Sequence, residues 1–168
     1  MASEFFPHNM TGNSSPSPYV VSSPSFLATF DPYKAFDGNY SYGQYCLLTS
    51  GTRRLQIDLG SGNACFPLTY SIRVNSVPEP NRAPKDWTFE GSNNGSSWDI
   101  LDTQTNQTGW TSGQLRTFNC LAEITYRYFR ITVTANNGDA TYTQIGEMYL
   151  SGELTKPYNS GFLNFFLP

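Results

Sequence analysis

The chain has 168 residues, which suits a single buried core of roughly 100 to 200 residues with short extensions. A net charge of −3 provides no basic surface to neutralise phosphates, and no run approaches the roughly 18 apolar residues of a membrane span. The sequence therefore disfavours nucleic acid as a partner and insertion into a membrane. Glycine (14 residues), proline (11 residues) and 15% aromatic content, beside only 14% charged residues, are typical of an all-β protein.

Residues 1–17 are predicted to form an extended N-terminal arm. Pro7 and Pro16 stand among Ser, Asn and Thr, at a spacing that helix and sheet interiors exclude, and Phe5-Phe6 is the one apolar pair. The segment has no basic start and no long apolar stretch, so we expect a protein that is made without a signal peptide. The cysteines are odd in number and form no C-x-x-C pair, which predicts free thiols at Cys46, Cys65 and Cys120, with a disulfide within one pair as the alternative.

Residues 18–153 alternate short strands with turns. The stretches "LQIDLG" (55–60) and "RYFRITVTA" (127–135) alternate apolar and polar residues, as half-buried strands do. "YTQIGEMYLSG" (142–152) is the last predicted strand of this body. No segment of ten or more residues carries a helical apolar stripe, so the sequence predicts an antiparallel β-sandwich.

The stretch "PKDWTFEGSNNGSSWDIL" (84–101) predicts a β-hairpin. Trp87 and Phe89 alternate with polar residues and are expected to face the core. Asn94-Gly95 offers the two positive-φ positions of a tight turn, which would bring Trp98 back antiparallel to the first strand and into the core.

Residues 154–168 form an apolar C-terminal tail that ends "GFLNFFLP". A small soluble monomer does not usually leave such a patch in water. We therefore expect both ends of the chain to dock on other chains of a larger assembly, most simply a homo-oligomer. The predicted contact residues are Phe5, Phe6, Phe162, Leu163, Phe165 and Phe166.

Five motifs, in order, resemble the discoidin or coagulation-factor type C superfamily: "YKAFDGNYS", "LQIDLG", "PKDWTFEGSNNGSSWDIL", "YRYFRITVTANNG" and "IGEMYLSG". The likeness covers roughly residues 18 to 153 and is greatest to family 32 carbohydrate-binding modules. It implies an eight-stranded antiparallel jelly-roll sandwich of the galactose-binding-like fold. Members are mostly non-catalytic and bind sugars, lipid headgroups or proteins through loops at one end of the sandwich.

The resemblance also implies a structural calcium ion between the first loop and the last strand. Matched residue by residue, its ligands fall on Lys34, Asp37, Asn39, Ser41, Gly146 and Glu147. Calcium takes about six to eight oxygens, and a tight Asp-Gly-Asn turn directs several inward. The family usually has a threonine hydroxyl where this chain has Tyr42, so Ser41 or the carbonyl of Tyr42 would replace it. The alternative is a plain turn at Asp37-Gly38 with Glu147 solvated.

For a sugar site the resemblance implies a histidine, an arginine, an asparagine and a loop aromatic. Asn81 matches the asparagine, whereas Ser76-Val77 stands at the arginine position and the one histidine, His8, lies in the N-terminal segment. A sugar requires an aromatic platform and a few polar groups. The loops near that end supply a different candidate set: Tyr42, Tyr45, Arg53, Asn81, Arg82, Trp110, Asn136 and Tyr142. The alternative for each tyrosine is an ordinary surface or edge-strand aromatic.

Catalysis has little support, because the single histidine has no orienting acid in view and no other nucleophile has a base. The first functional hypothesis is a glycan-binding module of a viral particle, a phage or phage tail, that contacts a cell-surface glycan of the host. The second is a structural or adaptor protein whose sandwich mediates assembly without binding sugar. Membrane-surface binding ranks last because the candidate loops are polar. We expect the protein on a virion or another extracellular particle.

Overall fold

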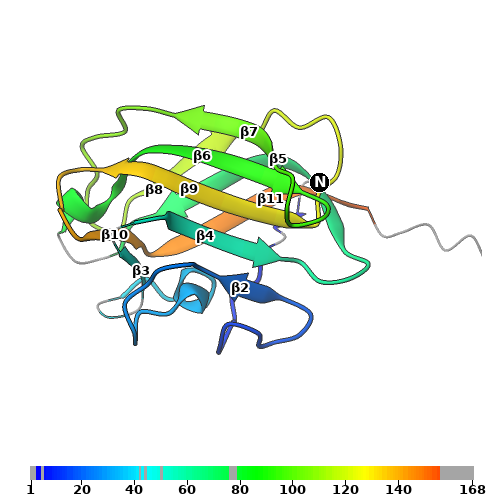
Figure 1. Cartoon of the computed structure of the whole chain (residues 1–168), viewed down its shortest axis with the longest axis horizontal. Coiled ribbons are helices and arrows are strands. Elements are labelled where there is room, and N and C mark those ends of the chain that lie inside the picture. The colour runs from blue at the N-terminus through cyan, green and yellow to red at the C-terminus, as the bar shows by residue number, and fades with distance from the viewer. Residues whose placement is uncertain are drawn as a thin grey trace, which may run out of the picture.

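In the computed structural model the described residues are 3–4, 6–41, 43, 45–49, 51–75 and 79–155. Two antiparallel β-sheets pack face to face, with a short two-stranded sheet at one margin (Figure 1). The described part of the chain contains two 3-10 helices, η1 (Pro32–Ala35) and η2 (Pro80–Arg82), and has no helix that is long and apolar enough to cross a membrane. The predicted antiparallel sandwich is confirmed.

The larger sheet has five strands in the order β2-β4-β9-β6-β7. Their bounds are β2 Val20–Ser22, β4 Arg53–Asp58, β9 Tyr128–Asn136, β6 Pro84–Ser92 and β7 Asp99–Gln104. The predicted alternation holds in β4 and β9, because Leu55, Ile57, Phe129 and Ile131 are each at most 1% exposed. One face of this sheet therefore supplies half of the core.

The opposing sheet has four strands in the order β1-β11-β5-β8. Their bounds are β1 Ser3–Glu4, β11 Glu147–Thr155, β5 Ala64–Arg73 and β8 Leu115–Asn119. The two-stranded sheet pairs β10 (Tyr142–Ile145) with β3 (Cys46–Thr49). The three cysteines are free thiols, as predicted.

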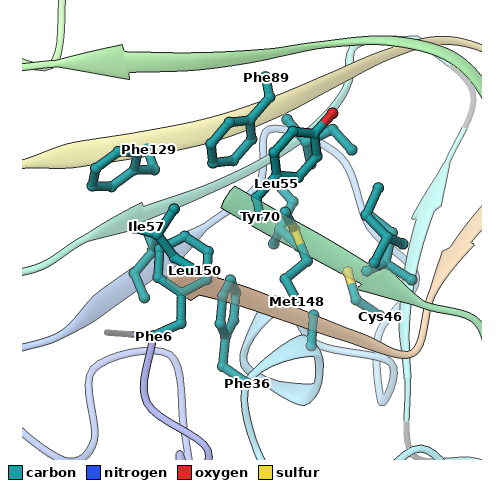
Figure 2. Close-up of a cluster of buried hydrophobic side chains, with 14 of the residues drawn as sticks. Phe6, Phe36, Cys46, Leu55, Ile57, Tyr70, Phe89, Phe129, Met148 and Leu150 are labelled. Carbon is teal, nitrogen blue, oxygen red and sulfur yellow. The ribbon is translucent and has the colours of Figure 1, made fainter. Parts of the chain in front are cut away.

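Aromatic rings fill the space between the two sheets (Figure 2). The ring of Tyr70 in β5 stacks on Phe89 in β6 with centroids 4.1 Å apart, and Phe89 stacks on Phe129 at 6.0 Å. The Tyr70 hydroxyl accepts a hydrogen bond from Trp87 Nε1 at 2.8 Å and donates one to Asp102 at 2.6 Å. The phenol thus satisfies its polar atom inside the core while linking β5 to β6 and β7.

The N-terminal segment is part of the body, which corrects the prediction of an extended arm over residues 1–17. Its first strand, β1, pairs with β11, and the Phe6 side chain, only 3% exposed, lies 5.3 Å from Phe36 and 5.9 Å from Phe129 between ring centroids (Figure 2). Met10 is also buried. Phe6 is therefore a core residue of its own chain and not an assembly contact, because residues of the same chain bury its ring. Phe5 lies outside the described residues.

The β6–β7 hairpin forms as predicted, but its turn differs from the prediction. The turn spans residues 93–98, and in the expected dipeptide only Gly95 has a positive φ, 72°. The amide oxygen of Asn94 accepts two backbone N–H groups within the turn, at 2.9 and 2.8 Å, which stabilises a wider loop. Trp98 is consequently half-buried beneath the Arg130 guanidinium, 4.0 Å from its ring centroid, and is not a core residue.

Replacing Phe6 with alanine tests whether the N-terminal segment belongs to the fold. Loss of a buried phenylalanine leaves a cavity, so the free energy of unfolding should fall by about 3–5 kcal/mol, measured by urea denaturation. Phe26→Ala is the matched control, since Phe26 is 36% exposed, and it should cost less than half as much. Equal, small losses in both variants would show that the Phe6 contacts do not stabilise the protein.

Candidate ligand-binding site

A pocket of about 270 Å³ lies at the end of the sandwich where β5 finishes and β6 and β8 begin. Backbone hydrogen bonds join its loops: Gly113 N–H donates to Asn75 O at 2.7 Å, and Val74 N–H donates to Gln114 O at 3.0 Å. The pocket is lined by Val74, Asn75, Glu79, Pro80, Ala83, Trp110, Thr111, Ser112 and Gln144. Its walls are thus apolar with several polar groups among them.

The indole of Trp110 is fixed by hydrogen bonds at its edge and by a guanidinium over one face. Its Nε1 donates to Pro84 O at 2.9 Å and to Gln107 O at 3.2 Å, and the Arg116 guanidinium lies 4.1 Å from its ring centroid. Burial lowers the pKa of Arg116. Because Trp110 is only 4% exposed and fully hydrogen-bonded, it forms a rigid wall and not a mobile surface aromatic.

Gln144 of β10 supplies the most unusual polar group in the pocket. Its side chain is 3% exposed, and its Nε2 finds no hydrogen-bond partner among the described residues. An unsatisfied buried amide costs roughly 1–3 kcal/mol, so such a group calls for an explanation. The Gln144 side chain also lines the pocket, so this unpartnered amide lies at the pocket wall.

Two ion pairs of Arg82 hold η2 against the loop after β9. Arg82 pairs with Glu79 and donates from Nε to Asp139 Oδ2 at 2.9 Å, while its guanidinium lies 5.3 Å from the ring centroid of Tyr142. The pKa of Asp139 is lowered, first by the backbone N–H groups of Tyr142 and Thr141 and then by Arg82. Arg82 and Tyr142 therefore position Glu79, which lines the pocket.

Asn137 ties three loops together from one amide. Its Nδ2 lies within hydrogen-bond distance of the carbonyls of Ala83 (3.0 Å), Gln107 (3.1 Å) and Pro84 (3.3 Å), and its backbone N–H donates to Ala83 O at 3.1 Å. The Pro84 carbonyl is the same one that receives the Trp110 indole. Asn137 therefore acts as a positioning residue for the Trp110 wall.

The structure separates the predicted sugar-binding residues. Trp110 alone of them lines the pocket among the described residues, and Asn81 is exposed on η2, next to the lining residue Pro80. Asn136 donates from Nδ2 to the carbonyls of Asp139 and Tyr142, so it shapes a turn.

The remaining candidates lie elsewhere. Tyr45 is 4% exposed and stacks on Phe30 with centroids 5.0 Å apart, so it packs inside the protein and is not a surface platform. Arg53 begins β4 opposite Val133 and does not line the pocket. Tyr42 lies outside the described residues, as do the tail residues Phe162, Leu163, Phe165 and Phe166.

Sequence reasoning missed most of the lining. Gln144 carried no usable signal, because only the structure shows that Thr143 and Gln144 are both buried, where strand alternation would expose one of them. Thr111, Ser112 and Asn75 carried none, because short polar loop residues are ordinary in any turn.

The predicted calcium ligands Asp37, Asn39 and Glu147 come together. The Asn39 N–H is 2.8 Å from Asp37 Oδ1 and 3.0 Å from Glu147 Oε1. Glu147 is 0% exposed, its Oε2 finds no hydrogen-bond partner among the described residues, and His8 Nδ1 lies 3.9 Å from that oxygen. Burial first, and the Glu147 carboxylate second, raise the pKa of Asp37 to about 7, against the effect of the Asn39 N–H. Glu147 is thus not the solvated strand residue of the alternative interpretation.

The other predicted ligands flank this pair. Ser41 N–H donates to Asn39 Oδ1 at 3.0 Å, and Lys34 Nζ donates to Gly43 O at 3.0 Å. A Cβ on Gly146 would lie 2.8 Å from Arg73 O, so only glycine fits there. No group of three His, Cys, Asp or Glu side chains able to hold a metal occurs in the described part of the chain, so an ion here would depend on two carboxylates and on carbonyl oxygens.

The fold and site define a β-sandwich module with a small, mostly apolar pocket at its loop end. The F5/8 type C domain family matches residues 14–148, and the chain belongs to this family. No sequence among the curated proteins matches it.

Solved structures share the fold. The family 32 module of NanJ from Clostridium perfringens, in complex with galactose, has a TM-score of 0.67 and 16% identity, over 90% of this chain and 99% of that one. An F5/8 type C domain from Bacteroides fragilis has a TM-score of 0.67 and 14% identity, over 82% and 93%. The family 32 module of EndoD from Streptococcus pneumoniae has a TM-score of 0.66 and 12% identity, over 90% and 100%.

Replacing Asn137 with alanine should loosen the pocket. The change removes the side-chain donor that three carbonyls share but leaves each carbonyl one other donor, so we expect the free energy of unfolding to fall by about 0.5–1.5 kcal/mol and amide hydrogen exchange to rise in residues 80–84 and 105–110. Asn119→Ala, at an exposed position of β8, is the control and should alter neither. Unchanged amide hydrogen exchange in these loops would show that Asn137 does not position them.

Proposed function

We propose that the protein is a non-catalytic glycan-binding module and that the pocket at the loop end receives a sugar unit. The observation that carries the proposal is the unpartnered amide of Gln144 beside the fixed indole of Trp110 in one pocket. Similar folds have been solved with galactose, with 4,5-unsaturated mannuronic acid and with GalNAc-β-1,3-galactose, which supports the same class of ligand here.

The lining matches the chemistry of a sugar. Sugars present an apolar ring face and a rim of hydroxyl groups, so they bind where aromatic and aliphatic walls meet a few polar groups. Trp110, Pro80 and Val74 offer the apolar walls, whereas Gln144 and Glu79 offer a donor and an acceptor. The volume, about 270 Å³, is close to the roughly 300 Å³ at which small-molecule sites begin, which favours one sugar unit over a long chain.

Gln144→Leu tests the site directly. Leucine is similar in size and removes an unsatisfied amide, so the fold should be unharmed, whereas affinity for the glycan should fall about tenfold or more. The measurement is a glycan array followed by titration of the best ligand. Gln56→Leu in β4, outside the pocket lining, is the matched control. Equal affinity of the two variants would exclude the pocket, and no binding by the unaltered protein at high density would leave the adaptor function.

We further propose that the module is carried on a virion, such as a phage particle or tail, or on another extracellular particle, where it contacts a host-cell glycan. The glycan-binding type of fold and the apolar residues near the C-terminus support this location; Phe6 no longer does, because it lies in the core. The adaptor function has one observation in its favour: Leu121 is 82% and Ile124 51% exposed. Such side chains suit a protein contact.

Calcium at Asp37 and Glu147 is also proposed. The half-buried carboxylate of Asp37 and the buried carboxylate of Glu147, with its orphaned Oε2, fit a hard cation that takes oxygen ligands, with the carbonyls of Lys34, Asn39 and Gly146 as the further candidates. Bound calcium would supply the positive charge that two adjacent carboxylates require. The ion would also stabilise the start of β11.

Chelation should lower the melting temperature. A ligand at about 100 times its Kd stabilises a fold by roughly 2.7 kcal/mol, which corresponds to about 5–10 °C for a chain of this size. Asp37→Asn and Glu147→Gln should each remove the difference between calcium-loaded and chelated protein, measured by calorimetry. Glu123→Gln, exposed and remote in sequence, should keep it. A melting temperature that is indifferent to chelation would refute the site.

A further inference from the structure

A second concave surface lies beside the start of β7. Figure 1 shows that β7 begins at the end of the sandwich opposite η2. We call this surface the apolar groove, and its volume is about 350 Å³. Three of its apolar side chains are strongly exposed: Leu121 at 82%, Ile100 at 62% and Ile124 at 51%. The carboxylates of Asp99 and Glu123 also line it. The groove shares no residue with the proposed sugar pocket.

The C-terminal tail leaves the body close to this groove. Thr155, the last residue of β11, pairs with Ala64, and the next residue, Cys65, exchanges backbone hydrogen bonds of 2.9 Å with Tyr126, which lines the groove. Neighbouring strands lie about 4.8 Å apart, so Thr155 is on the order of 10 Å from Tyr126. The thirteen residues 156–168 span up to roughly 43 Å when extended. The tail therefore has ample length to reach the groove of its own chain.

The tail and the groove are also complementary in chemistry. The tail has one basic residue, Lys156, and no acidic residue, whereas the groove has two carboxylates. Its large apolar side chains are Phe162, Leu163, Phe165, Phe166 and Leu167. Both surfaces would otherwise stay in water, which small soluble proteins avoid.

We propose that residues 162–167 dock in cis on the apolar groove formed by Ile100, Leu121 and Ile124. A short tether holds the tail near the groove at an effective concentration of about millimolar, which a second copy at micromolar concentration does not match. In the free chain the groove is thus covered by its own tail, and the inference does not depend on sugar binding or on calcium.

The test uses the full chain and single surface substitutions. Chymotrypsin cleaves after phenylalanine, so the initial rate of cleavage within 162–166, followed by mass spectrometry, reports whether the tail is covered. Leu121→Lys and Ile124→Lys should each raise that rate about tenfold, because a charge in the groove opposes apolar docking. Leu115→Lys, on β8 and 42% exposed, is the matched control and should cleave as the unaltered protein does.

The outcomes are distinct. Cleavage at the same rate in the Leu121, Ile124 and Leu115 variants overturns the inference, since the groove then protects nothing. Tail protection that appears only as protein concentration rises, together with dimers in light scattering, also overturns it and assigns the groove to a second copy. Protection in a monomer from 1 to 100 μM supports docking in cis. Glycan binding should be equal in all these variants, so failure of either proposal is recognised separately.

Discussion

The hydroxyl of Tyr70 fixes how the two sheets face each other. It accepts from Trp87 and donates to Asp102, so one buried phenol of β5 is bonded to two strands of the opposing sheet. A buried hydroxyl that lost either partner would be costly, so few relative offsets of the sheets are tolerated. Burial raises the pKa of Tyr70 far above its ordinary value, which keeps the donor protonated throughout the physiological range.

The pocket inherits its shape from this sheet geometry. Val74 follows directly after β5 and Ala83 directly precedes β6, so the spacing of the sheets sets the distance between two walls. The Trp110 indole donates to the carbonyl of Pro84, which is the first residue of β6, and forms the third wall. The proposed ion site adjoins the same place, because Gly146 N–H donates to Arg73 O at the end of β5. Stabilising the ion site would thus also order the pocket.

The alternation of apolar and polar residues correctly predicted strands, because it depends only on residues that are near one another in the sequence. Alternation in residues 55–58 and 128–133 marked strands whose inward faces are buried, since a period of two needs only one covered face. The burial of Phe6 could not be predicted in this way, because it depends on Phe36 and Phe129, which are distant in sequence. The wide turn at Asn94 likewise arose from side-chain acceptance of backbone N–H groups, which competes with the tight turn that Asn-Gly favours.

The pairing of β1 with β11 determines how the module would respond to mechanical tension. In this antiparallel pair Ser3 lies opposite Gly152, so the N-terminal end of β1 and the C-terminal end of β11 point the same way. A pull applied through both ends would load these hydrogen bonds one after another, as in opening a zip, and would then draw Phe6 out of the core. A pull through the C-terminal end of β11 alone, against a ligand held in the pocket, would leave the β1–β11 hydrogen bonds unloaded. This pairing would therefore resist a tether at the C-terminal end better than a pull through both ends.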